Sequence, residues 1–124
     1  MNTDVQTTST DYSKTDAQIR GIINSVSKYM PKVDLGIIAG EIMKAYNYAK
    51  NAHEWQFRKS GEPYISHPVE AILIMLSLRP DLTTIQACLL HDVAEDTSLT
   101  IEDIRVEFGD EVANICEWLC KVSK

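Results

Sequence analysis

The chain has 124 residues, 44% of them hydrophobic and 24% charged, and its net charge is −6. This length corresponds to one domain or part of one, and the composition is that of a globular protein rather than a low-complexity or collagen-like chain. An acidic chain has no broad basic face, which argues against general nucleic-acid binding, so a polyanionic ligand would need a local cationic pocket or a metal. The longest apolar stretch, residues 71–78, is too short to cross a bilayer, so no membrane partner is expected.

The first residues differ in composition from the rest of the chain. Residues 1–15 are rich in Thr, Ser and Asp, which predicts a mobile polar leader before a domain of residues 16–124. No secretory signal is readable, and the odd number of cysteines predicts reduced thiols and a cytoplasmic protein. Cys116 and Cys120 lie four residues apart on a predicted helix, and without a second Cys or His pair we interpret them as core residues.

From Asp16 onwards the apolar residues recur at helical spacing, and no segment alternates as a strand would. The first predicted helix ends at Pro31, and Asp34 is placed to cap the second. Residues 54–66 contain Ser-Gly and Pro and predict a loop. His67 then opens a third helix, with a proline in its first turn.

A turn at residues 79–81 precedes a fourth helix, for which residues 83–86 have the spacing of a capping box. This helix is apolar nearly all round from Ile85 to Leu90, which predicts a central position. A fifth helix is expected from Thr100 to near Gly109. A sixth carries an apolar stripe of Val112, Ile115, Cys116, Leu119 and Val122.

The sequence HDVAEDT, residues 91–97, places four ionisable groups directly after the most apolar helix segment. Such groups need partners if they are buried. In a helix, Glu95 lies one turn beyond His91 and Asp96 one turn beyond Asp92, so an imidazole and several carboxylates face one volume. Nitrogen and oxygen ligands of this kind suit a divalent transition metal such as Mn²⁺, Fe²⁺ or Zn²⁺. The alternative is a helix end whose charges face water.

Two further features belong to the loop and the helix that follows it. His67 is placed to supply a second imidazole to the same volume. Residues 58–61, Arg-Lys-Ser-Gly, combine two cations, a hydroxyl and a flexible glycine, which suits a phosphate contact. On spacing alone an exposed loop is the favoured explanation, because Glu54 and Glu62 flank the charges. His53-Glu54 does not continue into an HExxH motif, because Phe57 stands at the second histidine position, so we interpret His53 as a packing or capping residue.

Three segments together resemble a known family: AHEWQFRKSGEPYISHP (52–68), LLHDVAEDT (89–97) and FGDEV (108–112). They are similar in order and spacing to the hydrolase domain of RelA/SpoT homologues, the (p)ppGpp synthetase/hydrolase proteins of the stringent response. That domain belongs to the HD superfamily of metal-dependent phosphohydrolases. The resemblance covers roughly residues 40–124, and the joint presence of RKSGEPYISHP and HDVAEDT is much more specific than an HD pair alone.

The resemblance implies an all-α, HD-domain-like bundle of about six helices. It implies hydrolysis of the 3′-pyrophosphate of (p)ppGpp, giving GDP or GTP, in a parent protein that is also expected to have GTP pyrophosphokinase activity. By the same resemblance, Mn²⁺ or another divalent metal is held by His67, His91 and Asp92. The resemblance also implies that Glu95 and Asp96 help to activate or position the attacking water. It further implies that Arg58, Lys59 and Ser60 line the guanine nucleotide pocket.

The sequence departs from the family in two places. Trp55 stands where the family usually has glycine, which is expected to alter the packing of the loop. The family's fourth protein ligand, an Asp in a later motif like ADRLHN, has no counterpart before Lys124. We therefore expect a C-terminally truncated domain that lacks its last metal ligand, binds metal weakly, turns over poorly and self-associates through uncovered helix faces. The face expected to be uncovered is that of Val112, Ile115, Leu119 and Val122.

Two other functions remain open at this stage. One is a catalytically silent helical module that binds a nucleotide or a protein. The other is an HD phosphohydrolase acting on another nucleotide.

Overall fold

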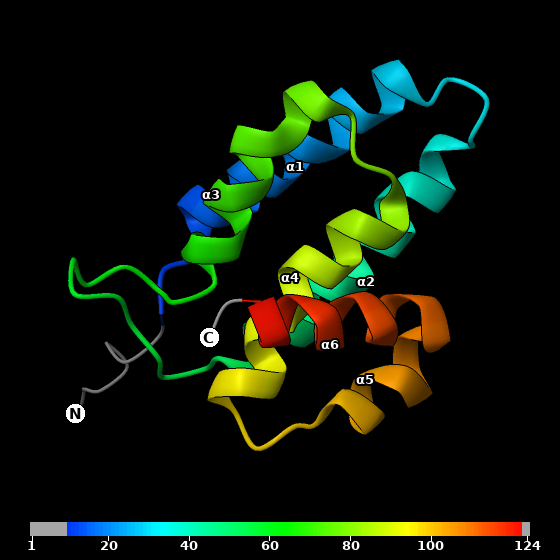
Figure 1. Cartoon of the computed structure of the whole chain (residues 1–124). Helices are drawn as coiled ribbons and strands as arrows, with labels where there is room; N and C mark the ends of the chain where they lie inside the picture. The colour runs from blue at the N-terminus through cyan, green and yellow to red at the C-terminus, as the bar shows by residue number, and fades with distance from the viewer. Residues whose placement is uncertain (1–9, 123–124) are drawn as a thin grey trace.

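The computed structural model describes residues 10–122, which form a bundle of α-helices (Figure 1). The helices in chain order are α1 (Ser13–Tyr29), α2 (Leu35–Ala52), α3 (Ser66–Met75), α4 (Leu82–Asp96), α5 (Ile101–Phe108) and α6 (Asp110–Val122). A single 3₁₀ turn, η2 (Leu76–Leu78), follows α3. Within residues 10–122 there is no strand, apart from an isolated bridge between Phe57 and Pro63. The prediction of an all-α bundle of six helices is confirmed.

Helix α4 forms the centre of the bundle, as its apolar sequence predicts. Five of its apolar side chains are fully buried: Ile85, Ala87, Leu89, Leu90 and Val93. It packs against α2, α3 and α6, while α1 packs on α2 and α3 (Figure 1). Helix α5 packs on α6. None of the described helices is both long and apolar enough to span a membrane.

Helix α4 begins with a cap other than the predicted one. The carboxylate of Asp81 accepts a hydrogen bond from the backbone N–H of Thr84 at 2.8 Å, so Asp81 is the N-cap. The capping box expected at residues 83–86 is therefore wrong. Asp81 immediately precedes the helix with extended backbone, which suits an N-cap. The Gln86 side chain donates instead to the backbone carbonyl of Glu41 on α2, at 2.9 Å.

Two other helix starts agree with the sequence. Asp34 caps α2, with its carboxylate 2.6 Å from the backbone N of Gly36. Thr100 and Asp103 form a reciprocal capping box at the start of α5. That helix ends at Gly109, whose φ of 93° is in the left-handed region that glycine adopts easily.

The first helix begins earlier than expected. Residues 1–9, part of the predicted leader, lie outside the described residues, but Ser13 already starts α1. Thr15 is only 2% exposed, and its hydroxyl lies 3.0 Å from the hydroxyl of Tyr46 on α2. Packing on α2 thus draws residues 13–15 into the helix, and the leader predicted for residues 1–15 stays a prediction.

Helix α6 covers most of the face that was expected to be open. Its stripe packs on α4, so Val112 is 3% exposed and Cys116 is fully buried. Val112 therefore does not belong to an uncovered face. The exposed apolar side chains of α6 are Trp118, which is 61% exposed, and Val122, which is 57% exposed.

Trp55 has an unfavourable backbone conformation in the loop between α2 and α3. Its φ is +71°, which L-residues other than glycine rarely adopt, and its side chain is 64% exposed. Trp55 stands where the resembled family usually has glycine, and the backbone at this position has a conformation that favours glycine.

Replacing Trp55 by glycine and by alanine separates the backbone effect from the loss of the indole. Both variants remove the side chain, but only glycine adopts this φ without steric cost. We expect Trp55→Gly to be more stable than Trp55→Ala by about 1 kcal/mol. Urea unfolding of the two variants measures the difference, and equal midpoints would show that the loop relaxes without strain.

Candidate metal and nucleotide site

The last turns of α4 bring three carboxylates together. Asp92, Glu95 and Asp96 each offer an oxygen, and these oxygens lie within 4.8 Å of one another. The helical spacing of i, i+3 and i+4 places them on one face. Asp92 is 6% exposed, whereas Glu95 and Asp96 are exposed, so the group runs from the core to the surface. Among residues 10–122, this is the one group of three or more acidic, His or Cys side chains close enough to share an ion.

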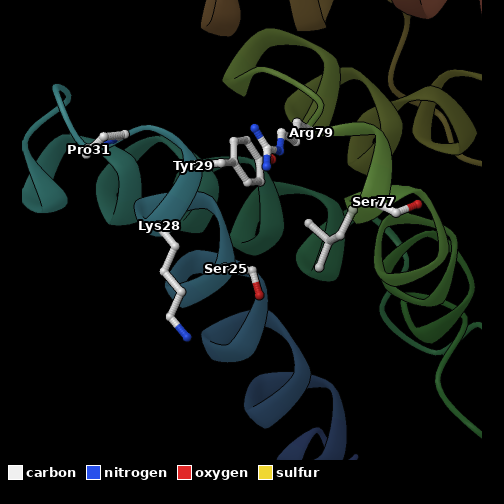
Figure 2. Close-up of a pocket in the computed structure, with 7 residues that line it drawn as sticks. Ser25, Lys28, Tyr29, Pro31, Ser77 and Arg79 are labelled. Carbon is white, nitrogen blue, oxygen red and sulfur yellow. The ribbon is translucent and has the colours of Figure 1, made fainter.

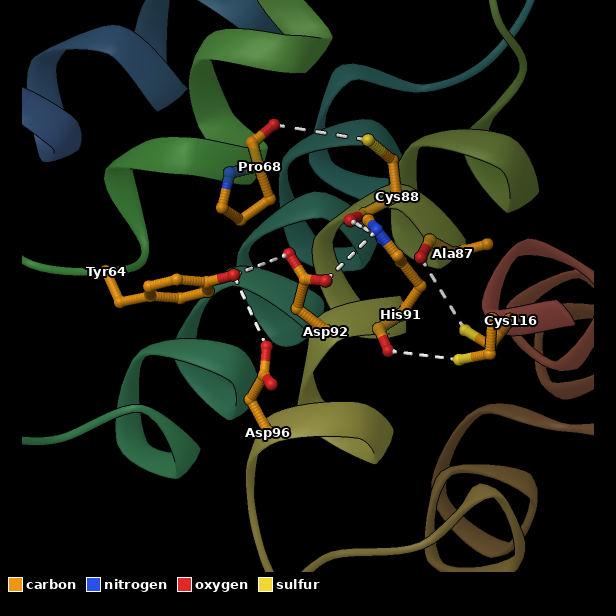
Figure 3. Close-up of polar contacts among 9 residues, drawn as sticks. Tyr64, Pro68, Ala87, Cys88, His91, Asp92, Asp96 and Cys116 are labelled. Atoms are coloured by element: carbon orange, nitrogen blue, oxygen red, sulfur yellow. Dashed lines mark hydrogen bonds and ion pairs between the residues drawn. The ribbon is translucent and has the colours of Figure 1, made fainter. Parts of the chain in front are cut away.

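The ring of His91 is fixed in the orientation that a metal ligand needs. Its Nδ1 lies 2.9 Å from the backbone carbonyl of Cys88, which can only accept, so Nδ1 carries a proton (Figure 3). In neutral imidazole the other nitrogen, Nε2, then has a free lone pair. A backbone partner of this kind is typical of metal-bound histidines.

The free nitrogen of His91 faces a carboxylate oxygen. Nε2 of His91 lies 3.3 Å from Oδ1 of Asp92. Two lone-pair atoms at this separation need a proton or a cation between or beside them. Neighbouring ligands of a metal bound at ~2.1 Å are separated by roughly 3.0–3.4 Å, so the pair fits a metal site.

Tyr64, in the loop before α3, reaches the same carboxylates and was assigned no role from the sequence. Its hydroxyl lies 3.4 Å from Oδ2 of Asp92 and 3.3 Å from Oδ2 of Asp96 (Figure 3). Burial, and then the charges of these two carboxylates, raise the pKa of the Tyr64 hydroxyl, so the phenol stays protonated and can donate. Tyr64 lies within the segment PYISHP, but nothing in its spacing indicates where the side chain points.

His67 lies beside this group without being part of it. It is exposed at the start of α3, and its ring centroid is 5.9 Å from that of Tyr64. Tyr64 also packs against His53, whose ring centroid is 4.9 Å from that of Tyr64. His53 also ends α2 and is 2% exposed, as the capping and packing interpretation expects.

Arg58, in the loop before α3, is bound by two side chains of α3. Its Nη1 lies 2.9 Å from Oε1 of Glu70 and 3.3 Å from Oγ of Ser66, both on α3. Lys59 and Ser60 are exposed at the tip of the same loop. The three residues predicted to line a nucleotide pocket are thus consecutive in the chain, but only Arg58 is fixed against α3.

Two thiols of α6 contact backbone carbonyls of α4. The thiol of Cys116 lies 3.6 Å from the carbonyl of Ala87, and that of Cys120 lies 3.4 Å from the carbonyl of His91 (Figure 3). Both contacts are with backbone atoms of α4. This agrees with the interpretation of the pair as core residues rather than metal ligands.

A cavity of about 620 Å³ lies elsewhere, between the end of α1 and the segment that follows α3 (Figure 2). Its lining residues are Ser25, Lys28, Tyr29, Pro31, Leu76, Ser77 and Arg79. Arg79 lies just before α4, whereas the three carboxylates lie at the far end of that helix. Because α4 is roughly 20 Å long, the cavity is separate from the carboxylate group. In Figure 2 the side chain of Lys28 extends away from Arg79, so the two cations do not converge on one ligand.

The central helix of this all-α bundle thus ends in a partly buried histidine and a buried aspartate, followed by two exposed carboxylates. The family model of the HD domain matches residues 45–124, and the chain belongs to the HD domain family. HD hydrolases are metal-dependent.

Curated relatives agree with this assignment. The chain is 48% identical over 86 residues to the guanosine-3′,5′-bis(diphosphate) 3′-pyrophosphohydrolase of Aquifex aeolicus, which covers 69% of this chain and 12% of that protein. It is 45% identical over 100 residues to the GTP pyrophosphokinase of Myxococcus xanthus, covering 81% of this chain and 13% of that protein. It is 40% identical over 99 residues to the bifunctional (p)ppGpp synthase/hydrolase SpoT of Escherichia coli, covering 80% and 14%. The chain thus spans about an eighth of the length of these relatives.

The three cysteines are expected to differ in reactivity. Burial raises the pKa of Cys88 to about 11 and that of Cys116 to about 12, whereas Cys120 is partly exposed. Because the thiolate is the reactive form, alkylation of the folded chain at pH 8 should modify Cys120 and leave the other two unmodified. Intact-mass spectrometry should show one adduct in buffer and three in denaturant, and none in buffer for Cys120→Ser. Rapid double alkylation of the folded chain would contradict the packing of α6 on α4.

Proposed function

We propose that this chain carries the metal-binding and nucleotide-binding residues of a (p)ppGpp 3′-pyrophosphohydrolase. The observation that carries the proposal is the pair formed by Nε2 of His91 and Oδ1 of Asp92, 3.3 Å apart beside two further carboxylates. The relatives named for this reaction or for (p)ppGpp synthesis and hydrolysis share 40–48% identity with the region that contains the pair. The reaction is the transfer of the 3′-pyrophosphoryl group to water, which leaves GDP or GTP and pyrophosphate.

In this proposal His67, His91 and Asp92 hold the metal, with Mn²⁺ as the preferred ion. The mixed nitrogen and oxygen donors are compatible with Mn²⁺. When bound, the metal supplies positive charge for the phosphate oxygens and makes water easier to deprotonate. His67 is exposed and approaches the site through its ring contact with Tyr64, so it is the ligand with the most freedom to move.

The remaining site residues act on the water and the nucleotide. Glu95 and Asp96 are exposed carboxylates beside Asp92, and we assign them to accepting the proton of the attacking water. Arg58, Lys59 and Ser60 contact the nucleotide and its phosphates. Since Nη1 of Arg58 already binds Glu70, the phosphates would be contacted by its other guanidinium nitrogens.

Three further elements belong to the proposal. The parent protein is bifunctional and cytoplasmic, with GTP pyrophosphokinase activity carried by residues other than those described here. Self-association stays a prediction, now through Trp118 and Val122, and sedimentation velocity at increasing concentration tests it. The 124-residue chain alone is predicted to bind Mn²⁺ weakly and to turn over poorly.

Metal binding and hydrolysis are tested on the same preparation. Mn²⁺ binding is followed by electron paramagnetic resonance at millimolar metal, and ppGpp cleavage by release of pyrophosphate. Replacing a residue that only hydrogen-bonds to a metal-ligating side chain typically weakens metal binding by ~10–100-fold. His91→Ala or Asp92→Asn should weaken Mn²⁺ binding by more than this, because each removes a proposed ligand. Any pyrophosphate release should disappear in both variants.

Asp110→Asn is the matched control, since Asp110 is an exposed carboxylate at the start of α6. Mn²⁺ binding that survives both site variants would overturn the assignment of the ligands. Hydrolysis at an ordinary enzymatic rate by the 124-residue chain would instead contradict the prediction of poor turnover. Nucleotide binding without metal would favour a silent binding module.

A further inference from the structure

The hydroxyl of Tyr64 connects two carboxylates that have different roles in the proposed reaction. It lies 3.4 Å from Asp92, a proposed metal ligand, and 3.3 Å from Asp96, a proposed proton acceptor. Both distances are long for an O–H···O hydrogen bond and nearly equal, as expected when one proton is shared between two acceptors. Figure 3 shows the phenol entering between the two carboxylates from the loop side.

The loop holds this phenol firmly. The ring packs on the buried ring of His53, and the backbone N–H of Tyr64 donates to the carbonyl of Gln56 at 2.9 Å. The side chain of Gln56 in turn lies 2.9 Å from Nδ1 of His53 and donates to the backbone carbonyl of Asp96, also at 2.9 Å. His53 and Gln56 therefore fix the position of Tyr64, and Gln56 also fixes the backbone of Asp96.

The two oxygens of Asp92 have different partners. Oδ1 faces Nε2 of His91 at 3.3 Å, whereas Oδ2 faces the hydroxyl of Tyr64. A carboxylate oxygen that accepts a hydrogen bond has less electron density to offer a cation, so Oδ1 of Asp92 is the better placed of the two oxygens to bind one. The same hydroxyl holds Asp96 beside Asp92 as a separate carboxylate.

We propose that Tyr64 is a positioning residue, which favours Oδ1 over Oδ2 of Asp92 as the oxygen that faces the metal and holds Asp96 away from the metal's ligand set. This inference rests on the proposed function, because it takes Asp92 as a ligand. Without the hydroxyl, both oxygens of Asp92 and an oxygen of Asp96 become available, so the metal environment changes rather than simply disappearing.

Tyr64→Phe tests the role, since it keeps the ring on His53 and removes only the hydroxyl. The matched control is Tyr48→Phe, where another partly buried tyrosine packs edge-on against Phe108 with 5.3 Å between ring centroids. We expect Tyr64→Phe to lower Mn²⁺ affinity about tenfold and to change the Mn²⁺ resonance spectrum. Tyr48→Phe should do neither, and thermal midpoints without metal should be similar for the two variants.

Two outcomes separate this inference from the proposed function. If Tyr64→Phe binds Mn²⁺ like the unmodified chain and with the same spectrum, the positioning role is overturned while the ligand assignment stands. If the unmodified chain binds no Mn²⁺, the metal site fails, and carbon NMR of the aspartate carboxyl groups decides the positioning role. Signals of Asp92 and Asp96 that shift in Tyr64→Phe but not in Tyr48→Phe support it, and unchanged signals overturn it.

Discussion

Asp92 places an acidic group, 6% exposed, on the helix that forms the centre of the bundle. An ionised carboxylate at such a position is unfavourable unless polar partners compensate for the lost hydration. The partners are His91, one residue before it, and Tyr64 from the loop after α2. The arrangement of α4 follows from this requirement. Its first turns are apolar and make the core, and its last turns carry polar groups that find partners on α4 itself and in the neighbouring loop.

The end of α4 is correspondingly well supported. The last carbonyls of a helix have no partner within it. Here the carbonyl of Val93 accepts from both the backbone N–H and the hydroxyl of Thr97, at 3.1 and 2.7 Å. The carbonyl of Asp96 accepts from Gln56, and that of His91 is contacted by the thiol of Cys120. Three separate elements thus hold the turn that carries the site, which limits the movement of the carboxylates and suits a pre-organised site.

Much of the fold follows from local sequence rules, and the exceptions have identifiable causes. Apolar spacing predicts the six helices, because burial on one face dominates the choice between helix and strand. The start of α4 was misplaced because both Asp81 and Thr83 are good capping residues, and only the tertiary contact of Gln86 with α2 decides between them. The face of α6 was misjudged because an apolar stripe does not indicate which helix covers it.

The candidate site was likewise predictable from the sequence only in part. The carboxylates of residues 92–96 come together through helical periodicity, which the sequence contains. The contact of Tyr64 with them depends on how a loop of about a dozen residues folds back over α4, and no periodic pattern describes a loop. The left-handed Trp55 within that loop could be suspected only from the resemblance, where glycine is usual.

Charge then restricts what this site can do. The chain has a net charge of −6, three carboxylates meet at the end of α4, and the proposed substrate is itself a polyanion. Arg58, the fixed cation of the loop, is 2.9 Å from Glu70 and 3.9 Å from Glu62, so its charge is largely compensated within the protein. Two like charges 4 Å apart near a protein surface repel by about 4 kcal/mol, so three carboxylates weaken the binding of a phosphate placed beside them. In the proposed function a cation therefore assists the binding of the nucleotide as well as the reaction of the water. This argues against a silent module that binds nucleotide without metal at the end of α4, because the anion would then lie where three carboxylates meet.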